Sequence, residues 1–142
     1  MSVKVRPYIY FYGECEEAVN LYSKAFKTKA KNIMRFSDIP PNSNMPPLSE
    51  KQKNWIIQAT IQLGDNLIRL SDSLEKINKD GSLVCICVEG NVDEIQHAFS
   101  TLKEGGEVLT PLARTFFSTC YGSLIDKFKV HWELSAEVQE QD

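Results

Sequence analysis

Four cysteines are the side chains of this 142-residue sequence best suited to nucleophilic, redox or soft-metal chemistry. Cys85 and Cys87 are two positions apart in an apolar run, so a strand would direct both thiols to one face. Their Cys-x-Cys spacing differs from the spacing of zinc knuckles and thioredoxin-type sites. Cys120 lies in an aromatic segment with no histidine nearby in sequence to activate it, and Cys15 stands alone. We therefore predict buried free thiols that act as small apolar side chains, not a disulfide framework.

Two histidines and two aspartates are further candidates for acid–base or metal chemistry. His97 is expected on the outer face of a helix and His131 at the start of a strand, where surface or capping roles suit them. Asp72 and Asp126 are predicted to be turn or strand-end carboxylates. The sequence has no G-x-G-x-x-G, P-loop or G-x-S-x-G motif, so it offers no nucleotide or phosphate loop and no serine elbow.

The elements that must position these residues follow a pattern that occurs twice. Gly13 and Gly90 each follow an apolar strand pattern and precede an acidic helix start, and they are 77 positions apart. The same offset relates Tyr22 to Phe99, each expected on the buried face of its helix. The repeat favours two paired modules around a shared cavity. Two unrelated strand–helix units are the alternative, since such units are common.

Hydrophobic periodicity gives the remaining elements. The first strand carries apolar or aromatic residues on both faces, including Tyr8 and Tyr10, and is therefore predicted to be buried on both sides. In the strand from Trp55, alternation places Gln58 and Thr60 on the face away from the core. Strands are predicted at 3–12, 30–36, 55–63, 67–71, 83–88, 107–117, 122–126 and 130–134, and helices at 14–26 and from 91 to the glycine pair 105–106.

The segment 37–54 contains four of the six prolines and is predicted to be a long loop without helix or paired strand. A lid or binding loop and a tolerated insertion are both compatible with it. The acidic tail, 136–142, is expected to fray.

Composition excludes several classes of protein. The apolar fraction of 42% and charged fraction of 25% are those of a globular domain, and the net charge of −3 provides no basic field for nucleic acid. No apolar stretch reaches the roughly 20 residues that span a bilayer, and the first residues alternate instead of forming a signal-peptide core. A cytoplasmic protein without nucleic-acid or membrane partners is expected.

The chain resembles a known family over nearly its whole length. Pro7-Tyr-Ile-Tyr-Phe11 followed by Glu17-Ala18 is similar to the opening of the PhnB-like branch of the glyoxalase, bleomycin-resistance and extradiol-dioxygenase (vicinal oxygen chelate) superfamily. Thr115-Phe-Phe117, Tyr121-Gly122 and the ending Asp126-Lys-Phe-x-Val-x-Trp132 are its most specific segments.

The resemblance implies an α+β fold. Two βαβββ modules, about 1–75 and 80–136, would form a cup-shaped mixed sheet around one cavity with helices outside, within a single glyoxalase-like domain covering 1–142. Members of the family are commonly dimers, so a homodimer is expected.

Enzymes of this superfamily hold one divalent metal with side chains from the first strand of each module and a glutamate in the last strand. The matching positions here fall near Pro7 or Tyr8, near Val84 or Cys85, and at Glu133. Only Glu133 is a usual ligand, although Cys85 could bind a softer metal, and a lone carboxylate does not retain a metal against water.

A further position argues in the same direction. The branch often has histidine where this chain has Gln58, a neutral amide that can hydrogen-bond a ligand but binds transition metals poorly. No metal and no other cofactor is therefore expected.

The resemblance places an aromatic segment along the cavity wall. A pocket with apolar walls and a few polar groups suits a small, partly aromatic or amphipathic ligand. The predicted pocket residues are Gln58, Thr60, Phe117, Tyr121, Trp132 and Glu133. Filling of the sheet interior is the alternative role for these side chains.

Two classes of function follow. The first is a metal-free small-molecule binding protein, like the antibiotic-binding members of the superfamily. The alternative is a metal-dependent lyase, isomerase or dioxygenase-like enzyme whose ligands are other residues. No catalytic residue is identified.

Overall fold

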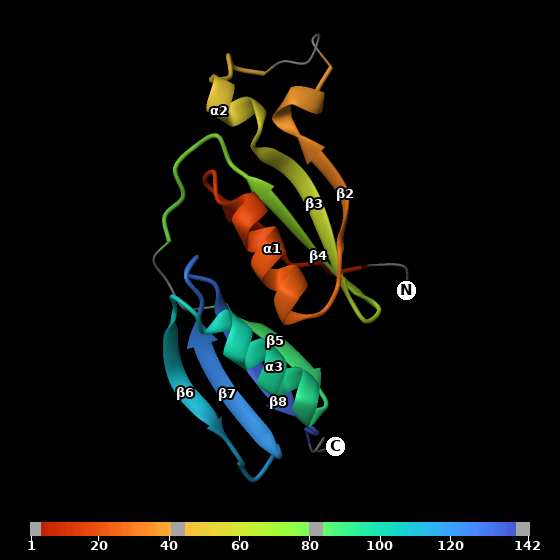
Figure 1. Ribbon diagram of the computed structural model, residues 1–142, viewed down its shortest axis with the longest axis vertical. Coiled ribbons are helices and arrows are strands. Elements are labelled where there is room, and N and C mark those ends of the chain that lie inside the picture. The colour runs from red at the N-terminus through yellow and green to blue at the C-terminus, as the bar shows by residue number, and fades with distance from the viewer. Residues whose placement is uncertain (1–3, 41–44, 80–83, 139–142) are drawn as a thin grey trace. The chain divides into compact units, whose positions relative to one another are not determined.

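The computed structural model describes residues 4–40, 45–79 and 84–138, which form two compact units (Figure 1). The first comprises residues 1–23 and 27–78, and the second comprises 24–26 and 79–142. The predicted strand positions Val3 and Leu83, residues 41–44 of the predicted loop and the last four residues of the tail lie outside the described residues. Within the described ranges, no helix has the length and apolar character needed to cross a membrane.

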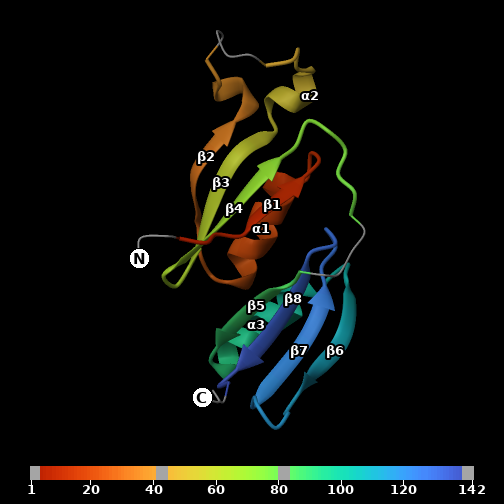
Figure 2. The ribbon, with the colours of Figure 1, turned by 180° about the vertical axis from the view of Figure 1, so that it is seen from behind.

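The first unit is a four-stranded mixed sheet with the strand order β1-β4-β3-β2. Strand β1 runs parallel to β4, and the other neighbours are antiparallel. Helix α1 lies against one face of this sheet in both views (Figures 1 and 2). The elements are β1 (Tyr8–Phe11), α1 (Cys15–Ala25), β2 (Ala30–Arg35), the 3-10 turn η1 (Phe36–Asp38), α2 (Glu50–Lys53), β3 (Ile56–Leu63) and β4 (Asn66–Asp72).

The second unit repeats this topology with the strand order β5-β8-β7-β6. Here β5 runs parallel to β8, the other neighbours are antiparallel, and α3 covers one face. The fold is therefore the predicted α+β fold of repeated βαβββ units, and not a doubly wound parallel sheet. The elements are β5 (Ile86–Gly90), α3 (Val92–Leu102), β6 (Glu107–Ala113), β7 (Cys120–Ile125) and β8 (His131–Ala136).

The repeated aromatics lie in the two cores, as the sequence predicted. Tyr22 of α1 and Phe99 of α3 are both buried, and the Tyr22 ring centroid is 6.5 Å from that of Phe11 in β1. In the second unit, a Cβ added to Gly122 would lie 2.8 Å from Phe99 Cε2. The close approach of α3 to β7 therefore requires glycine at this position.

Asp72 joins three elements of the first unit. Its carboxylate accepts the Cys15 N–H at the start of α1 (3.0 Å) and the Ile56 N–H at the start of β3 (3.1 Å). Burial raises the pKa of Asp72, while these backbone donors act in the opposite direction. The residue is a buried strand-end carboxylate with a structural role, consistent with the sequence interpretation.

The first strand departs from its prediction in length and burial. It spans Tyr8–Phe11 instead of 3–12, and Tyr8 and Tyr10 are 43% and 53% exposed, respectively. The prediction that both faces are buried is wrong because α1 covers one face of the sheet, with Phe11, and the two tyrosines project from the other. Their rings stack on each other with centroids 4.7 Å apart.

The proline-rich segment is not wholly a loop. Helix α2 forms within it after Pro47, where Ser49 caps the helix. Ser49 Oγ accepts the Gln52 N–H at 3.2 Å, and Gln52 Oε1 accepts the Ser49 N–H at 3.0 Å. The expectation of no helix in 37–54 is wrong because the prolines precede this capping box and do not interrupt the turn it starts.

Candidate functional site

The chemically distinctive side chains of the second unit gather on the sheet face opposite α3. Gly122 and Trp132 are buried on the α3 side, so the alternating residues Tyr121 and Glu133 point the other way. Register pairs Glu133 with Ser123 of β7 and with Cys87 of β5. We call the surface formed by Cys85, Cys87, Tyr121, Ser123 and Glu133 the distal face; Figure 2 shows its strands in front of α3.

A phenol–carboxylate pair lies at the centre of the distal face. The Tyr121 hydroxyl donates to Glu133 Oε1 at 2.9 Å, joining β7 to β8. Burial, the hydrogen bond to Glu133 and the charge of that carboxylate raise the pKa of Tyr121 to about 12. The phenol therefore stays protonated at neutral pH and acts as a donor, and Glu133 acts as an acceptor.

Two thiols accompany this pair. Cys85 and Cys87 are exposed, which corrects the prediction that all four cysteines are buried; Cys15 and Cys120 are buried as predicted. The difference arises because β5 is an edge strand and these two side chains point away from α3. Burial first, and then the negative charge of Glu133, raises the pKa of both thiols. The exposed thiol pair, Cys85 and Cys87, is thus poorly suited to nucleophilic attack at neutral pH.

An aromatic wall, formed by Phe116 and Phe117, borders the phenol–carboxylate pair of Tyr121 and Glu133. The Phe117 ring lies edge-on to Tyr121 and to Phe116, with centroid distances of 5.1 Å in both cases. A turn fixes these rings, because Thr115 Oγ1 accepts the N–H groups of Phe117 (3.3 Å) and Ser118 (3.1 Å). The predicted strand 107–117 therefore ends earlier, at Ala113. Phe116 is 85% exposed, an unusual state for so large an apolar side chain.

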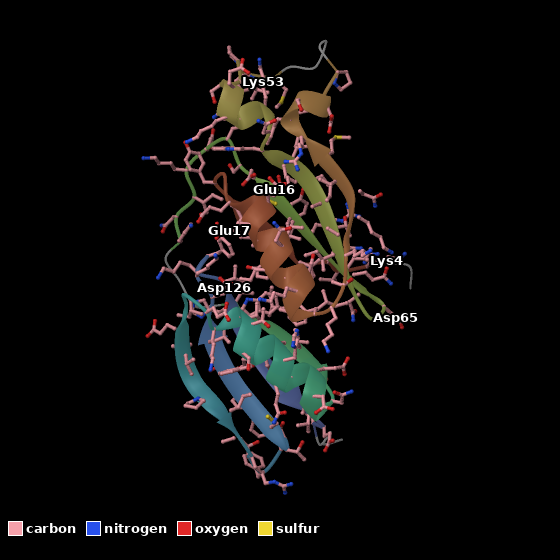
Figure 3. All side chains as sticks on the ribbon, in the orientation of Figure 1. Lys4, Glu16, Glu17, Lys53, Asp65 and Asp126 are labelled. Atoms are coloured by element: carbon pink, nitrogen blue, oxygen red, sulfur yellow. The ribbon has the colours of Figure 1, made fainter. Side chains whose placement is uncertain are left out.

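Trp132 does not belong to this arrangement. It is buried on the α3 side of β8 and donates its indole N–H to Asp126 Oδ2 at 2.9 Å. Asp126 lies in the turn between β7 and β8 (Figure 3). Of the predicted pocket residues in the second unit, the structure thus brings together Phe117, Tyr121 and Glu133 and places Trp132 in the core.

The other two predicted pocket residues belong to the first unit. Gln58 and Thr60 lie on β3 and point away from α1, as their alternation predicted. Thr60 is paired in register with Arg69 and is buried, whereas Gln58 is partly exposed opposite Met34 of β2. The exposed tyrosines of β1 project from the same face of this sheet, because Tyr8 is also in register with Arg69.

The residues at the superfamily's metal-ligand positions do not fit a hard divalent cation. Tyr8 is stacked on Tyr10, Cys85 offers a soft sulfur donor, and Glu133 already accepts the Tyr121 hydroxyl. Among the described residues, no three His, Cys, Asp or Glu side chains are grouped so as to hold a metal ion. A hard cation requires several oxygen or nitrogen donors at once, and this donor set does not supply them.

The sequence reasoning missed Phe116 and the exposure of Cys87. Phe116 stands next to a predicted pocket residue, but an apolar pair in a predicted strand does not show which ring is exposed. The shared face of Cys85 and Cys87 was readable from their spacing, whereas its exposure depends on where α3 packs.

Known proteins share sequence and fold with this chain. No protein-family model matches the sequence. Protein PA1353 from Pseudomonas aeruginosa is 28% identical, with a TM-score of 0.79 over 96% of this chain and 98% of that one. A PhnB protein from Bacillus cereus, described as a putative 3-demethylubiquinone-9 3-methyltransferase, is also 28% identical, with a TM-score of 0.75 over 94% of this chain and 99% of that one.

More distant similarities agree. Protein YjdN of Escherichia coli is 22% identical over 140 residues, which are 94% of this chain and 95% of that protein. The fosfomycin resistance protein FosX from Mesorhizobium loti shares the fold, at 11% identity and a TM-score of 0.61 over 95% of this chain and 91% of that one. Together with the repeated βαβββ topology, these similarities support the resemblance of the chain to the PhnB-like branch of the glyoxalase, bleomycin-resistance and extradiol-dioxygenase superfamily.

Proposed function

We propose that this protein binds a small molecule on the distal face and does so without a catalytic metal. One observation carries the proposal: Glu133, at the position of the superfamily's last metal ligand, is held by the Tyr121 hydroxyl at 2.9 Å. A carboxylate fixed in this way presents an oriented acceptor to a ligand. The edge-to-face rings of Phe117 and Tyr121 provide an apolar surface beside it.

The chemistry of the distal face favours binding over bond making. The exposed thiol pair and the Tyr121 phenol could act as nucleophiles or bases there, but their raised pKa values keep them protonated at neutral pH. The remaining candidate base, the Glu133 carboxylate, already accepts the Tyr121 hydroxyl at 2.9 Å. General base catalysis needs a group with a pKa near the working pH. The distal face thus supplies hydrogen bonds and ring contacts, the features of a binding site.

The binding site is tested by ligand screening on matched variants. A compound library is screened by chemical-shift perturbation on the full chain, and hits are retested on Glu133→Gln and Tyr121→Phe. We expect hits that shift the resonances of Phe117 and Tyr121 and that bind at least about tenfold more weakly to a variant, the loss of roughly one good hydrogen bond. Glu104→Gln makes the same charge change at an exposed turn residue and should leave binding unchanged. Hits confined to other surfaces would contradict the proposal.

The metal-independent character is tested separately. Protein purified without chelator should contain far less than one divalent metal per chain by elemental analysis. Nickel or zinc is then titrated into the wild type and into Gln58→His, which introduces the histidine often found in the branch. Tight stoichiometric binding by the wild type would support the alternative, a metal-dependent enzyme, and would overturn the metal-free proposal.

We also propose that the protein forms a homodimer. Each sheet ends in an edge strand with exposed apolar side chains, Ile33 and Met34 on β2 and Val108 and Leu109 on β6. Exposed apolar edges favour association, and a two-fold axis would cover them in pairs. Light scattering at micromolar concentration should give twice the mass of one chain, and Leu109→Lys should shift the equilibrium toward the monomer if β6 is the interface. A monomeric wild type would refute the dimer.

A further inference from the structure

The chemical class of the ligand can be inferred from the charge around Glu133. Its hydrogen-bond partners within the described residues are neutral, the Tyr121 hydroxyl at 2.9 Å and the Cys85 thiol, and no lysine or arginine of the described second unit forms an ion pair with it. Glu89 adds a second negative charge on the same side, because it stands two positions after Cys87 in β5 and Cys87 is in register with Glu133. Within the described second unit, the distal face therefore carries negative charge that no lysine or arginine ion pair balances.

The aromatic wall also favours a positively charged ligand. The faces of aromatic rings carry partial negative charge and attract cations, most strongly when a ring lies partly out of water. Phe116, Phe117 and Tyr121 form a continuous edge-to-face series that extends from an 85% exposed ring to the phenol bound to Glu133. A cation at Glu133 would thus have ring surface beside it. A small hydrated metal ion would make little use of such a surface, whereas an ammonium group with carbon substituents would be in contact with it.

We propose that the distal face recognises an organic cation, an ammonium group that carries apolar substituents. The positive nitrogen lies against Glu133, and its substituents contact Phe117 and the exposed ring of Phe116. This inference rests on the proposed binding function and adds the charge and the chemical class of the ligand. An anionic ligand is disfavoured because the Glu133 and Glu89 carboxylates, on the same face of β8 and β5, would repel it.

A pair of isosteric probes isolates the charge. Choline and 3,3-dimethylbutan-1-ol have nearly the same shape and differ in that a positive nitrogen replaces a quaternary carbon. Each is titrated into the full chain at pH 8, and the resonances of Phe116, Phe117 and Tyr121 are followed by NMR. We expect choline to bind at least about tenfold more tightly than its neutral isostere.

Variants then assign the preference to residues. Glu133→Gln keeps an oxygen acceptor for Tyr121 but removes the charge, and should bring the two probes within about twofold of each other. Phe116→Ser, at an exposed ring whose loss does not threaten folding, should weaken choline binding by about threefold. Glu104→Gln is the control for an equal change in net charge and should retain the wild-type ratio.

The outcomes separate this inference from the binding function. Equal affinity for both probes, a stronger response to the neutral probe, or a ratio unchanged in Glu133→Gln would overturn the cation inference. Absence of any choline shift at high millimolar concentration would overturn it too. In each case the binding function stands if an uncharged compound still shifts Phe117 and Tyr121, and it falls if no compound of any charge does.

Discussion

Removal of the Asp126 carboxylate should strongly destabilise the second unit. Asp126 is 1% exposed, and its Oδ1 accepts the N–H groups of Phe128 (2.8 Å) and Val130 (3.0 Å), while Oδ2 accepts the indole N–H of Trp132 (2.9 Å). One carboxylate thus closes the turn between β7 and β8 and fixes the largest core side chain of this unit. Replacement by alanine leaves three donors in a buried site.

The magnitude follows from these three bonds. An unsatisfied buried donor costs about 1–3 kcal/mol, but water entry and relaxation of the turn reduce the sum, so Asp126→Ala should lower the free energy of unfolding by about 4 kcal/mol. Asp126→Asn keeps one oxygen for the two backbone donors and turns an amide NH₂ toward the Trp132 N–H. Two donors then face each other, and we expect a loss of about 2 kcal/mol.

The assay is urea unfolding of the full chain, followed by far-ultraviolet circular dichroism. Trp132→Phe removes the indole donor. In that background, the decrease in the free energy of unfolding caused by Asp126→Asn should therefore be about 1 kcal/mol smaller than in the wild type. Asp65→Asn, at the exposed turn between β3 and β4, is the matched control and should change stability by less than about 0.5 kcal/mol (Figure 3). An Asp126→Ala protein within about 1 kcal/mol of the wild type would refute the assigned role of the carboxylate.

Two further predictions concern the first unit and the distal face. Gly64→Ala should lower the free energy of unfolding by about 1 kcal/mol, because a φ of +58° is unfavourable for alanine but nothing lies within 4 Å of the added Cβ. Gly13→Ala should lower it by at least about 2 kcal/mol in the same urea assay, because its φ is +82° and the added Cβ would lie 2.7 Å from Trp55 Cζ2. Equal losses would show that Trp55 moves aside freely. An alkylating thiol reagent at pH 8 should modify the exposed thiol pair and spare the two buried cysteines, as read by mass spectrometry. Glu133→Gln should at least double the rate, because loss of the negative charge lowers the pKa of both thiols and raises the thiolate fraction, whereas an unchanged rate would contradict the electrostatic role of Glu133.

The sequence by itself determined the repeat of two units, and the family resemblance implied their βαβββ topology. The repeat that relates Gly13 to Gly90 and Tyr22 to Phe99 corresponds to two βαβββ units with the same strand order, and both aromatics are buried. The elements of each unit can be predicted because the spacing of apolar residues indicates the type of element and, where apolar and polar residues alternate, its core-facing side. The cap of α2, Ser49-x-x-Gln52, is a pattern present in the sequence that the prediction of a loop, made from the prolines, did not use.

Part of the candidate site could also be predicted from the sequence. Gln58 and Thr60 occupy the predicted side of β3, and Phe117, Tyr121 and Glu133 belong to the aromatic segment and last strand that the resemblance singled out. The assignment of Trp132 to the pocket conflicts with its adjacency to Glu133, since neighbours in a strand point to opposite faces. Alternation alone would have separated these two residues.

Only the tertiary structure decided which face is buried in the strands that carry apolar residues on both faces. Tyr8 and Tyr10 of β1, Cys85 just before β5 and Cys87 within β5 follow strand patterns that are apolar on both faces, so periodicity could not tell the helix-covered side from the other. The packing of α1 and α3 against one side of each sheet settles this, through contacts between residues far apart in the sequence. The same packing turns Tyr121 toward Glu133 and directs Trp132 to Asp126, because a strand within a sheet can bury one set of alternating side chains only by presenting the other.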